Sequence, residues 1–365
     1  MTAETIGVKV DGVSRRYAHR VKGEVYAARD VSLDVRPGEL LTLLGPSGCG
    51  KTTTLRMIAG FQKPSDGRIF IGERDVTQVM ANDRDIGFVF QNYALFPHLN
   101  VYENVAYGLR VRRHGEAALG KAVGDVLAMV GLKGYERQMP HQLSGGEQQR
   151  VALARAIVIK PRVLLFDEPL SNLDAKLRVQ MRGEIQHLQK TLGITTVYVT
   201  HDQEEAMAIS DRIAVMNKGR IVQLGTADRL YRRPATVFVA GFIGRANLID
   251  VTVLETGAGR AVIDIGGVTH VLNGAGEGLS AGARARAVLR PEAIALGQAG
   301  AAGAIPGVVR SRTYLGEKAE YVVETGGQSL LVVRFEAENE HFASGSAVGV
   351  RLPASDVQLL VGDEA

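Results

Sequence analysis

The segment Gly45-Pro46-Ser47-Gly48-Cys49-Gly50-Lys51-Thr52 decides the fold of this chain. It follows the pattern G-x-x-x-x-G-K-T, and its surroundings fit that pattern, because the apolar run Glu39–Leu44 precedes it and the helix-type stretch Lys51–Ala59 follows it. Glycines let backbone N–H groups turn inward around phosphate oxygens, and the start of a helix adds favourable partial charge. The sequence therefore predicts a phosphate-binding loop between a buried strand and a helix.

The side chains of this loop predict a site for ATP and Mg²⁺. We expect Lys51 to reach the β- and γ-phosphates and the Thr52 hydroxyl to ligate Mg²⁺. Cys49 is expected to be a small loop residue and not a redox group. The candidate nucleotide-binding residues of the loop are Gly45, Pro46, Ser47, Gly48, Cys49, Gly50, Lys51, Thr52 and Thr53.

Further strands and helices alternate in the first part of the chain. Val163–Phe166 and Thr195–Thr200 are short apolar or β-branched runs, typical of a parallel sheet covered on both faces. Helix signals dominate three segments, Leu143–Ile159, Ala175–Leu192 and Gln203–Ser210. The pattern predicts an α/β core whose binding residues lie at the carboxyl ends of the strands.

Two acids follow the strand Val163–Phe166. Asp167 is placed to hold Mg²⁺ through water, and Glu168 to orient or deprotonate the water that attacks the γ-phosphate. An acidic pair at the end of a strand is common by itself, but a phosphate-binding loop upstream in the same chain favours the functional interpretation.

The segment Leu143-Ser144-Gly145-Gly146-Glu147-Gln148-Gln149-Arg150 opens a helix. Ser144 with Glu147 three residues later forms a capping box, and the glycines leave the amides of the first turn uncovered. A capping box alone would be structural. One chain needs only one cradle for the γ-phosphate, so a second anion-binding helix end suggests that two chains share their nucleotides.

The chain changes character near residue 240, and we expect domains of residues 1–239 and 240–365. Short β-type runs separated by glycines fill the second part, and 20 of the 43 glycines lie there. The runs predict a small all-β barrel or sandwich. They are Leu248–Leu254, Ala261–Ile265, Ala285–Leu289, Gly307–Tyr314, Ala319–Glu324 and Leu330–Phe335.

Composition and charge limit the possible functions. The chain carries no run of about 18 apolar residues, as a membrane helix would need, and its first ten residues lack the apolar core of a secretory signal. The one cysteine fits a reducing cytosol. Residues 1–239 hold 33 Lys and Arg against 25 Asp and Glu, a net of +8, but these charges are scattered, which favours a phosphate-binding enzyme over a nucleic-acid partner. We expect a cytosolic chain whose membrane role comes through a partner.

Taken in order, the loop at 45–52, the segment Leu143–Arg150, the pair Asp167-Glu168 and His201 resemble the ATPase subunit of an ABC transporter over essentially the whole chain. The resemblance implies a P-loop NTPase core with a helical subdomain and an antiparallel β subdomain. It also implies that Ser144, Gly145, Gly146 and Glu147 form the signature, which contacts ATP bound to a second copy. The expected assembly is a homodimer with two ATP molecules at its interface.

Further site residues rest on the same resemblance. Gln91 matches a glutamine that contacts Mg²⁺ and water and senses the membrane partner. Ser171 and Asp174 match the D-loop, which couples the two ATP sites; the alternative is a helix-capping turn, and the two roles are compatible. His201 matches a histidine that touches the γ-phosphate, and Tyr17 matches the aromatic residue that stacks on adenine.

The resemblance extends to the importer branch, whose C-terminal regulatory module is an OB-like β-barrel; Arg290-Pro291-Glu292 is similar to one of its segments. It implies two transmembrane permease subunits, a solute-binding protein, no nucleic acid, and a peripheral position on the cytoplasmic face of the membrane. Phe242–Asn247 and Asn82–Gly87 resemble the polyamine and ferric-iron members. We expect the segment Gln91–Gly108, with an exposed aromatic-rich stretch at Tyr93–Phe96, to contact the permeases.

Other functions stay open at this point. Close relatives within the branch carry sulfate, thiosulfate or phosphonate. A soluble ABC ATPase acting on nucleic acid would show a long coiled coil or a second P-loop, and the sequence has neither. A P-loop kinase or small-molecule-binding protein would explain neither Leu143–Arg150 nor His201. The second domain could also be an independent ligand sensor that inhibits the ATPase.

Overall fold

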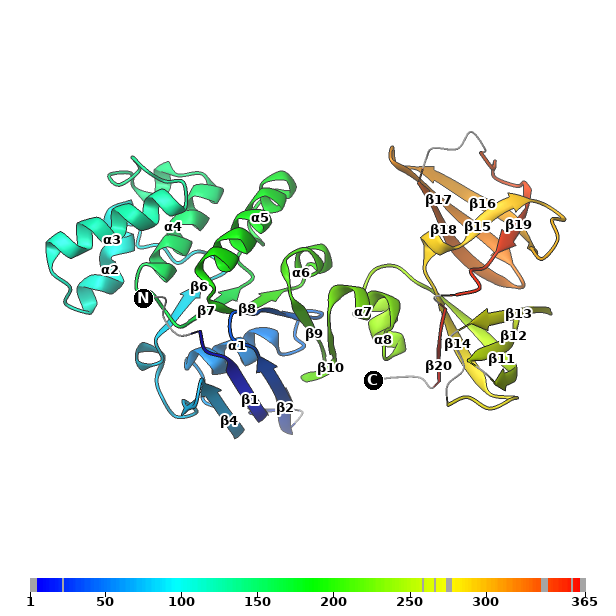
Figure 1. Cartoon of the computed structure of the whole chain (residues 1–365), viewed down its shortest axis with the longest axis horizontal. Helices are drawn as coiled ribbons and strands as arrows, with labels where there is room; N and C mark the ends of the chain where they lie inside the picture. The colour runs from blue at the N-terminus through cyan, green and yellow to red at the C-terminus, as the bar shows by residue number, and fades with distance from the viewer. Residues whose placement is uncertain are drawn as a thin grey trace. The chain divides into compact units, whose positions relative to one another are not determined.

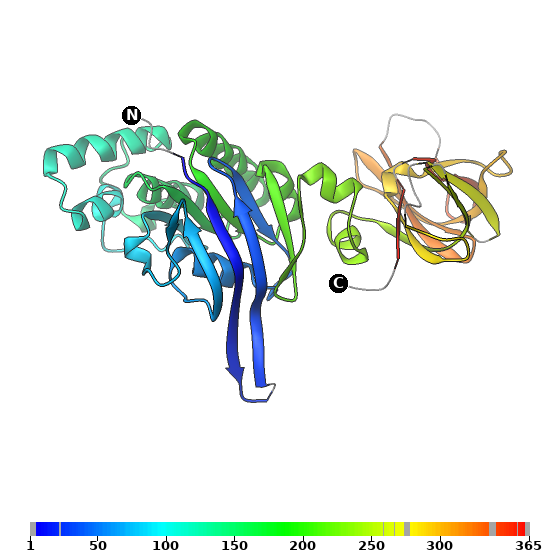
Figure 2. The same cartoon turned by 60° about the horizontal axis from the view of Figure 1, so that its bottom comes forward.

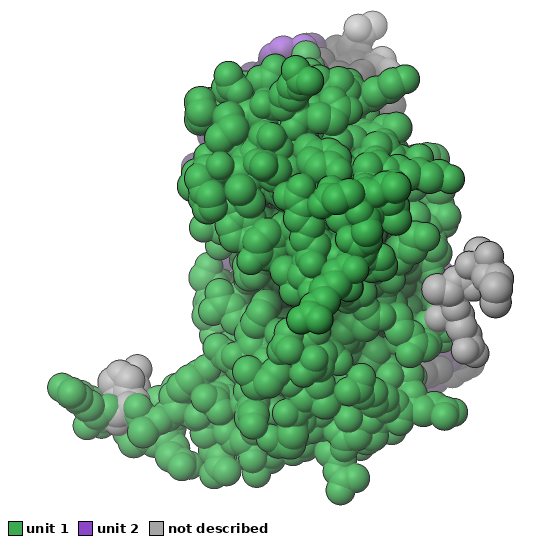
Figure 3. Space-filling model, turned by 90° about the vertical axis from the view of Figure 1, so that its left-hand side faces the viewer, with its two compact units in different colours: residues 1–227 green, residues 228–365 purple. Residues whose placement is uncertain are grey.

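The computed structural model describes residues 5–21, 23–257, 259–265, 267–273, 278–335, 341–355 and 357–361. The chain divides into two compact units, residues 1–227 and residues 228–365, which Figure 3 colours separately. The short helices α7 (Ala227–Arg232) and α8 (Val237–Phe242) come between the last strand of the first unit and the first strand of the second. The domain boundary at residue 239 stays a prediction.

A six-stranded sheet forms the centre of the first unit, in the order β10-β9-β3-β8-β7-β6 (Figure 1). Five strands are parallel, and β10 pairs with β9 in the antiparallel sense. Every residue of β3, β7 and β8 is buried, because helices cover both faces, and these are the three core strands that the apolar runs predict. The strands are β3 (Leu40–Leu44), β6 (Ile86–Val89), β7 (Val163–Asp167), β8 (Thr195–Thr200), β9 (Arg212–Asn217) and β10 (Arg220–Gly225).

A smaller antiparallel sheet, in the order β2-β1-β4-β5, accompanies the central one. Its strands are β1 (Val8–His19), β2 (Gly23–Val35), β4 (Asp66–Ile71) and β5 (Arg74–Asp75). Strands β1 and β2 form a long hairpin whose tip extends beyond the rest of the unit (Figure 2). Side chains of β1, β2 and β4 pack with the P-loop helix in one apolar cluster, so this sheet helps to hold that helix in place.

Helices cover the central sheet, and most of their ends are capped. Asn100, Ser144, Asp174 and Asp202 are N-caps whose side chains accept a backbone N–H, as the sequence predicts for Ser144. Asn100 caps α2, Ser144 caps α4, Asp174 caps α5 and Asp202 caps α6. The helices are α1 (Lys51–Ala59), α2 (Val101–Val111), α3 (Glu116–Met129), α4 (Gly145–Ile157), α5 (Ala175–Leu192) and α6 (Gln203–Ile209), with 3₁₀ turns at η1 (Ala81–Asp83) and η2 (Pro140–Gln142).

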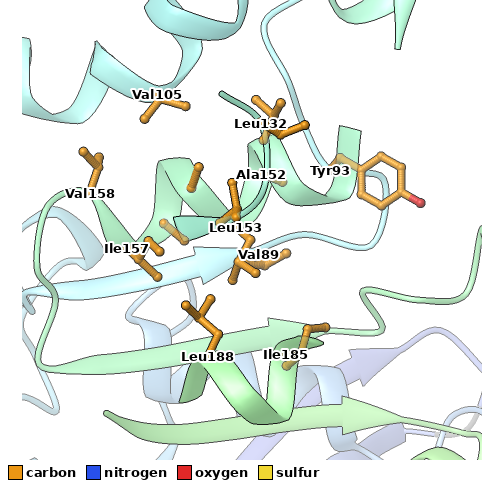
Figure 4. Close-up of a cluster of buried hydrophobic side chains, with 14 of the residues drawn as sticks. Val89, Tyr93, Val105, Leu132, Ala152, Leu153, Ile157, Val158, Ile185 and Leu188 are labelled. Carbon is orange, nitrogen blue, oxygen red and sulfur yellow. The ribbon is translucent and has the colours of Figure 1, made fainter. Parts of the chain in front are cut away.

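A second apolar cluster joins α2, α3, α4 and α5 to the sheet. Figure 4 shows side chains of α4, among them Ala152, Leu153 and Ile157, facing Val89 of β6 and Leu188 of α5. Burial of this kind stabilises a fold by about 25 cal/mol per Å² of apolar surface. The helix that begins at Ser144 is therefore fixed against both the sheet and α5.

The second unit consists of two five-stranded antiparallel sheets, in the orders β13-β12-β11-β14-β20 and β15-β19-β16-β17-β18. One apolar cluster fills the space between them, and the six predicted β-runs are all strands, which confirms the all-β, OB-like class. The elements are β11 (Asn247–Gly257), β12 (Arg260–Ile265), β13 (Val268–Asn273), β14 (Arg284–Leu289), η3 (Pro291–Ala293), β15 (Ala295–Gln298), β16 (Ile305–Tyr314), β17 (Lys318–Thr325), β18 (Gln328–Phe335), β19 (Ala347–Arg351) and β20 (Gln358–Leu360).

Within the described residues, every helix falls short of the length and hydrophobicity that a membrane crossing requires.

Candidate nucleotide-binding site

The loop between β3 and α1 depends on its glycines. Gly48 has a φ of 78° and Gly50 a φ of 103°, in the left-handed region that side chains disfavour. A Cβ at Gly50 would lie 2.3 Å from the carbonyl oxygen of Ala27, and one at Gly45 would lie 2.3 Å from that of Met216. The loop can therefore take this shape only with glycine at 45 and 50.

Lys51 closes the loop from inside. Its side chain is buried, and Nζ donates hydrogen bonds to the carbonyl oxygens of Gly45 at 2.8 Å and Pro46 at 3.1 Å. A buried ammonium that has only carbonyl partners would be better satisfied by phosphate oxygens. Cys49 is buried 4.0 Å from this Nζ, and burial raises the pKa of its thiol, which fits a small packing residue.

Thr52 and Asp167 meet at the carboxyl ends of the central strands. The Thr52 hydroxyl, in the first turn of α1, donates to Oδ1 of Asp167 at 3.0 Å, and Arg56 lies 3.9 Å from Oδ2. Burial raises the pKa of Asp167, while the hydrogen bond from Thr52 lowers it. Mg²⁺ prefers oxygen ligands and is usually held by one or two carboxylates with phosphate oxygens, so this donor pair fits it.

Gln91, Glu168 and His201 converge from three different segments. Oε2 of Glu168 lies 3.1 Å from Nδ1 of His201 and accepts a hydrogen bond from Nε2 of Gln91 at 3.4 Å. Glu168 directly follows β7 and has a φ of 47°, a strained conformation for a non-glycine residue that recurs at functional sites. The structure thus brings together the three residues that we expect to act on the attacking water and the γ-phosphate, namely Glu168, Gln91 and His201.

A cavity of about 30 Å³ lies beside this group, lined in part by Glu168, Thr200 and His201. Its volume is sufficient for a water molecule. Behind it, the buried carboxylate of Glu205 accepts hydrogen bonds from Thr200 at 2.6 Å and from the hydroxyl of Tyr198. Burial raises the pKa of Glu205.

Sequence reasoning missed this buried support, together with the ion pair of Asp202 with Arg182 at 2.9 Å. The spacing Asp202-x-x-Glu205 could have indicated a capped helix start. Nothing in the spacing indicates that Glu205 turns inward toward β8, the strand that His201 follows.

The signature segment presents an open helix start. The Ser144 side chain and backbone N–H both donate to Oε2 of Glu147 at 2.7 Å, and these bonds lower the pKa of Glu147. Ser144 and Gly145 are exposed, whereas Gly146 is buried, and a Cβ at Gly146 would lie 3.0 Å from Leu177. Among the described residues, no hydrogen bond joins this segment to the P-loop of the same chain. The signature is therefore accessible to a ligand from outside.

The remaining predicted residues are Ser171 and Asp174 of the D-loop and Tyr17. Ser171 Oγ donates to the carbonyl oxygen of Glu168 at 3.0 Å, and Asp174 caps α5. Asn172 between them donates to the carbonyl oxygen of Gln91 at 2.9 Å. Tyr17 on β1 is 40% exposed, which leaves ring surface accessible, although its hydroxyl donates to Gln62.

The expectation of an exposed aromatic stretch at Tyr93–Phe96 is wrong. Tyr93 is 6% exposed and belongs to the apolar cluster that includes residues of α4 (Figure 4), while Leu95 and Phe96 are half-buried. Left-handed backbone at Tyr93 and Ala94 turns the first aromatic ring inward. Within Tyr93–Phe96 only Ala94 is exposed, and Pro97 and His98 directly after this stretch are exposed as well.

Two family models match the chain. Residues 28–171 match the ABC transporter family, and residues 287–360 match the TOBE domain. The first match contains the P-loop, the signature and the pair Asp167-Glu168. The second lies within the all-β unit.

Characterised relatives resemble almost the whole chain. It is 50% identical over 311 residues to the Fe(3+) ions import ATP-binding protein FbpC 1 of Rhizobium meliloti, covering 85% of this chain and 87% of that protein. It is 49% identical to the spermidine/putrescine import ATP-binding protein PotA of Acidothermus cellulolyticus, covering 90% and 87%.

Solved structures share the fold of the first unit. The dimeric structure of the bacterial ABC transporter cassette MJ0796 is 32% identical, with a TM-score of 0.54, and covers 60% of this chain and 98% of that one. A post-hydrolysis state of the same cassette, bound to ADP and phosphate, matches with the same TM-score at 33% identity. The chain therefore belongs to the ATP-binding, ATP-hydrolysing subunits of ABC transporters, and its second unit contains a TOBE domain.

Proposed function

We propose that the chain powers an importer in which two copies hold two ATP molecules between them and drive two membrane-spanning permease subunits. The cargo we propose is ferric iron or a polyamine such as spermidine or putrescine. The observation that carries the proposal is the convergence of Gln91, Glu168 and His201 beside the Thr52–Asp167 pair. These groups can bind a nucleotide and activate water, and they lie where a parallel sheet presents its ligands.

Nucleotide binding begins at the loop. We expect the phosphates of ATP to replace the carbonyl oxygens of Gly45 and Pro46 as partners of Lys51. Thr52 and Asp167, with Gln91, would hold Mg²⁺, which supplies positive charge next to the transferring phosphoryl group. We assign the adenine contact to Tyr17, because its ring on strand β1 is partly exposed.

Hydrolysis needs a base and an orienting group for water. In the proposed mechanism Glu168 accepts the proton of the attacking water, and His201 holds the water and the γ-phosphate in line. The cavity of about 30 Å³ beside both side chains supports this assignment. A positioned general base contributes about 10²- to 10⁴-fold to a rate.

The second copy would complete each site. Ser144, Gly145 and Gly146 of the partner copy would donate to the γ-phosphate through uncovered amides at a helix start, and Ser171 and Asp174 would couple the two sites. The exposed signature and the dimeric assembly of the related cassette support a homodimer. ATP binding would then close the dimer, and hydrolysis would reopen it.

Cargo and location rest on the relatives. The matched proteins from Rhizobium meliloti and Acidothermus cellulolyticus are named for ferric iron and for spermidine and putrescine. We propose that the chain lies peripherally on the cytoplasmic face of the membrane, and that a solute-binding protein delivers the cargo to the permeases. The TOBE-containing unit would regulate the ATPase.

Uptake measurements test the proposed function. In cells that lack the gene, restoring the wild-type chain should restore uptake of either radiolabelled ferric iron or radiolabelled spermidine. The matched control is Lys51→Ala, which removes the phosphate contact and should restore neither. If wild type restores uptake of sulfate instead, the cargo assignment is wrong. If wild type restores no uptake at all, the importer assignment fails.

A further inference from the structure

A strained turn at Tyr93–Ala94 lies near the start of Gln91–Gly108, the segment that we expect to contact the permeases. Tyr93 has a φ of 61° and Ala94 a φ of 48°, so two consecutive non-glycine residues occupy the left-handed region. Such residues persist only where the surroundings fix them. The turn's own backbone bonds run from Tyr93 N–H to the Phe90 carbonyl at 3.0 Å and from Ala94 N–H to the Asn92 carbonyl at 2.6 Å.

Arg155 supplies the external support for this turn. One terminal nitrogen of its guanidinium donates to the carbonyl oxygen of Ala94 at 2.6 Å, and the other donates to that of Tyr93 at 2.8 Å. The guanidinium also lies 5.6 Å from the ring centre of Phe96. It therefore binds both carbonyls of the turn and the aromatic ring that follows it.

The charge on Arg155 is unusually placed for a purely packing role. The residue is half-buried, and burial lowers the pKa of its guanidinium. Within the part of the chain that the structure describes, no carboxylate lies within ion-pair distance of it. Burying a cation costs free energy, and here its partners among the described residues are carbonyl oxygens and an aromatic ring. A purely apolar side chain would fill the same space without this cost, which indicates that the hydrogen bonds to the turn have a role of their own.

Helix α4 carries Arg155 near its end and begins at the signature serine, Ser144. Arg155 lies eleven residues after Ser144, which corresponds to about 16 Å of helix at 1.5 Å per residue. The second half of the helix is fixed by the apolar cluster that includes Ala152, Leu153 and Ile157 (Figure 4). A displacement of the turn would therefore move α4 through Arg155, and with it the signature residues at the start of the helix.

We propose that Arg155 is a positioning residue that makes the Tyr93–Ala94 turn and the signature helix α4 move as one body. A membrane partner that presses on residues 94–98 then shifts Gln91 on one side and Ser144–Gly146 on the other. The same contact thus acts on the ATP of its own chain and on the ATP of the partner copy. The coupling rests on the proposed function, whereas the support of the turn by Arg155 does not.

The test is a double-mutant cycle on the purified full-length chain. Arg155→Met keeps the length of the side chain and removes both donors. Ala94→Gly makes the left-handed turn accessible without external support, because glycine populates positive φ about as readily as negative φ. Lys121→Met, on the exposed face of α3, is the matched control. The readouts are kcat and KM for ATP, and amide hydrogen exchange of residues 92–97.

We expect Arg155→Met to lower kcat about tenfold with KM for ATP within about twofold, and to speed exchange of residues 92–97 at least about tenfold. Adding Ala94→Gly should bring kcat and exchange back to within about threefold of the Ala94→Gly chain. The Lys121→Met chain should behave as wild type. Arg155→Lys keeps the charge, and its kcat and exchange rates should lie between those of wild type and Arg155→Met. If Arg155→Met does not fold, Arg155→Lys takes its place in the cycle.

Two results would overturn the inference. One is normal exchange of residues 92–97 in Arg155→Met; the other is a loss of kcat that Ala94→Gly leaves untouched, since Arg155 would then act by some route other than the turn. If the wild-type chain itself failed to hydrolyse ATP, the proposed function would fall, while exchange and its rescue by glycine would still decide the role of Arg155.

Discussion

Removal of the Tyr198 hydroxyl probes the buried support under His201. Tyr198 and Glu205 are both buried, and the Tyr198 hydroxyl donates a hydrogen bond to the Glu205 carboxylate. In the Tyr198→Phe variant, Thr200 is the one hydroxyl donor left of these two. A hydrogen bond to a charged group contributes about 1.5–3 kcal/mol. For a unit of this size that corresponds to a fall in Tm of roughly 3–12 °C. The ring itself should stay in place against Phe166, 5.4 Å away between ring centres.

The pH dependence of that loss follows from the pKa of Glu205. Burial raises its pKa in the folded chain, whereas the hydrogen bonds from Thr200 and Tyr198 lower it. A carboxyl whose folded pKa is raised stabilises the fold least above that pKa and most below its unfolded pKa. The variant raises the pKa of Glu205 further, so its loss of stability should be largest above the folded pKa of Glu205 and should shrink as the pH falls below it.

Scanning calorimetry measures the effect on the transition that shifts upward with ATP, which identifies the first unit. Tyr107→Phe is the control, because Tyr107 is 46% exposed and should lose almost nothing. A Tm equal to that of wild type, or a deficit that grows on acidification, would refute the account of Glu205.

Two further perturbations test the loop and the metal donors. Gly50→Ala should abolish ATP binding in calorimetry, because the new Cβ would lie 2.3 Å from the Ala27 carbonyl oxygen, whereas Gly48→Ala, with no atom within 4 Å of its Cβ, should weaken binding far less. Equal losses in the two variants would contradict the steric argument. Thr52→Val removes the hydroxyl next to Asp167 and should raise the Mg²⁺ concentration for half-maximal ATPase at least about tenfold. An unchanged Mg²⁺ requirement would remove Thr52 from the metal site.

The parts of the fold that the sequence predicted are those with strong local signals. The P-loop, the buried strands and the helix starting at Ser144 follow from glycine spacing, apolar runs and a capping box, because these features act over a few residues. The smaller antiparallel sheet was expected only from the resemblance. Its strand β1 alternates too weakly and carries too many irregularities in register for periodicity to identify it.

Long-range contacts explain what the sequence could not predict. The stretch Tyr93–Phe96 was expected to be exposed because it follows Gln91 and contains aromatic residues, and only the left-handed turn shows that Tyr93 points inward. Arg155 interrupts an apolar run, which by pattern alone indicates a solvated charge. Its carbonyl partners lie 61 and 62 residues away, at a separation that no local rule covers.

The central claim is that Glu168 activates water for ATP shared between two copies, and Glu168→Gln tests it most directly. The substitution keeps the shape of the side chain and its position beside His201 and Gln91 but removes the base. We predict that kcat falls at least about 100-fold, that ATP affinity stays within about twofold, and that the variant elutes as a stable dimer with ATP and Mg²⁺. Turnover close to wild type, or a variant that stays monomeric at saturating ATP, would contradict the account.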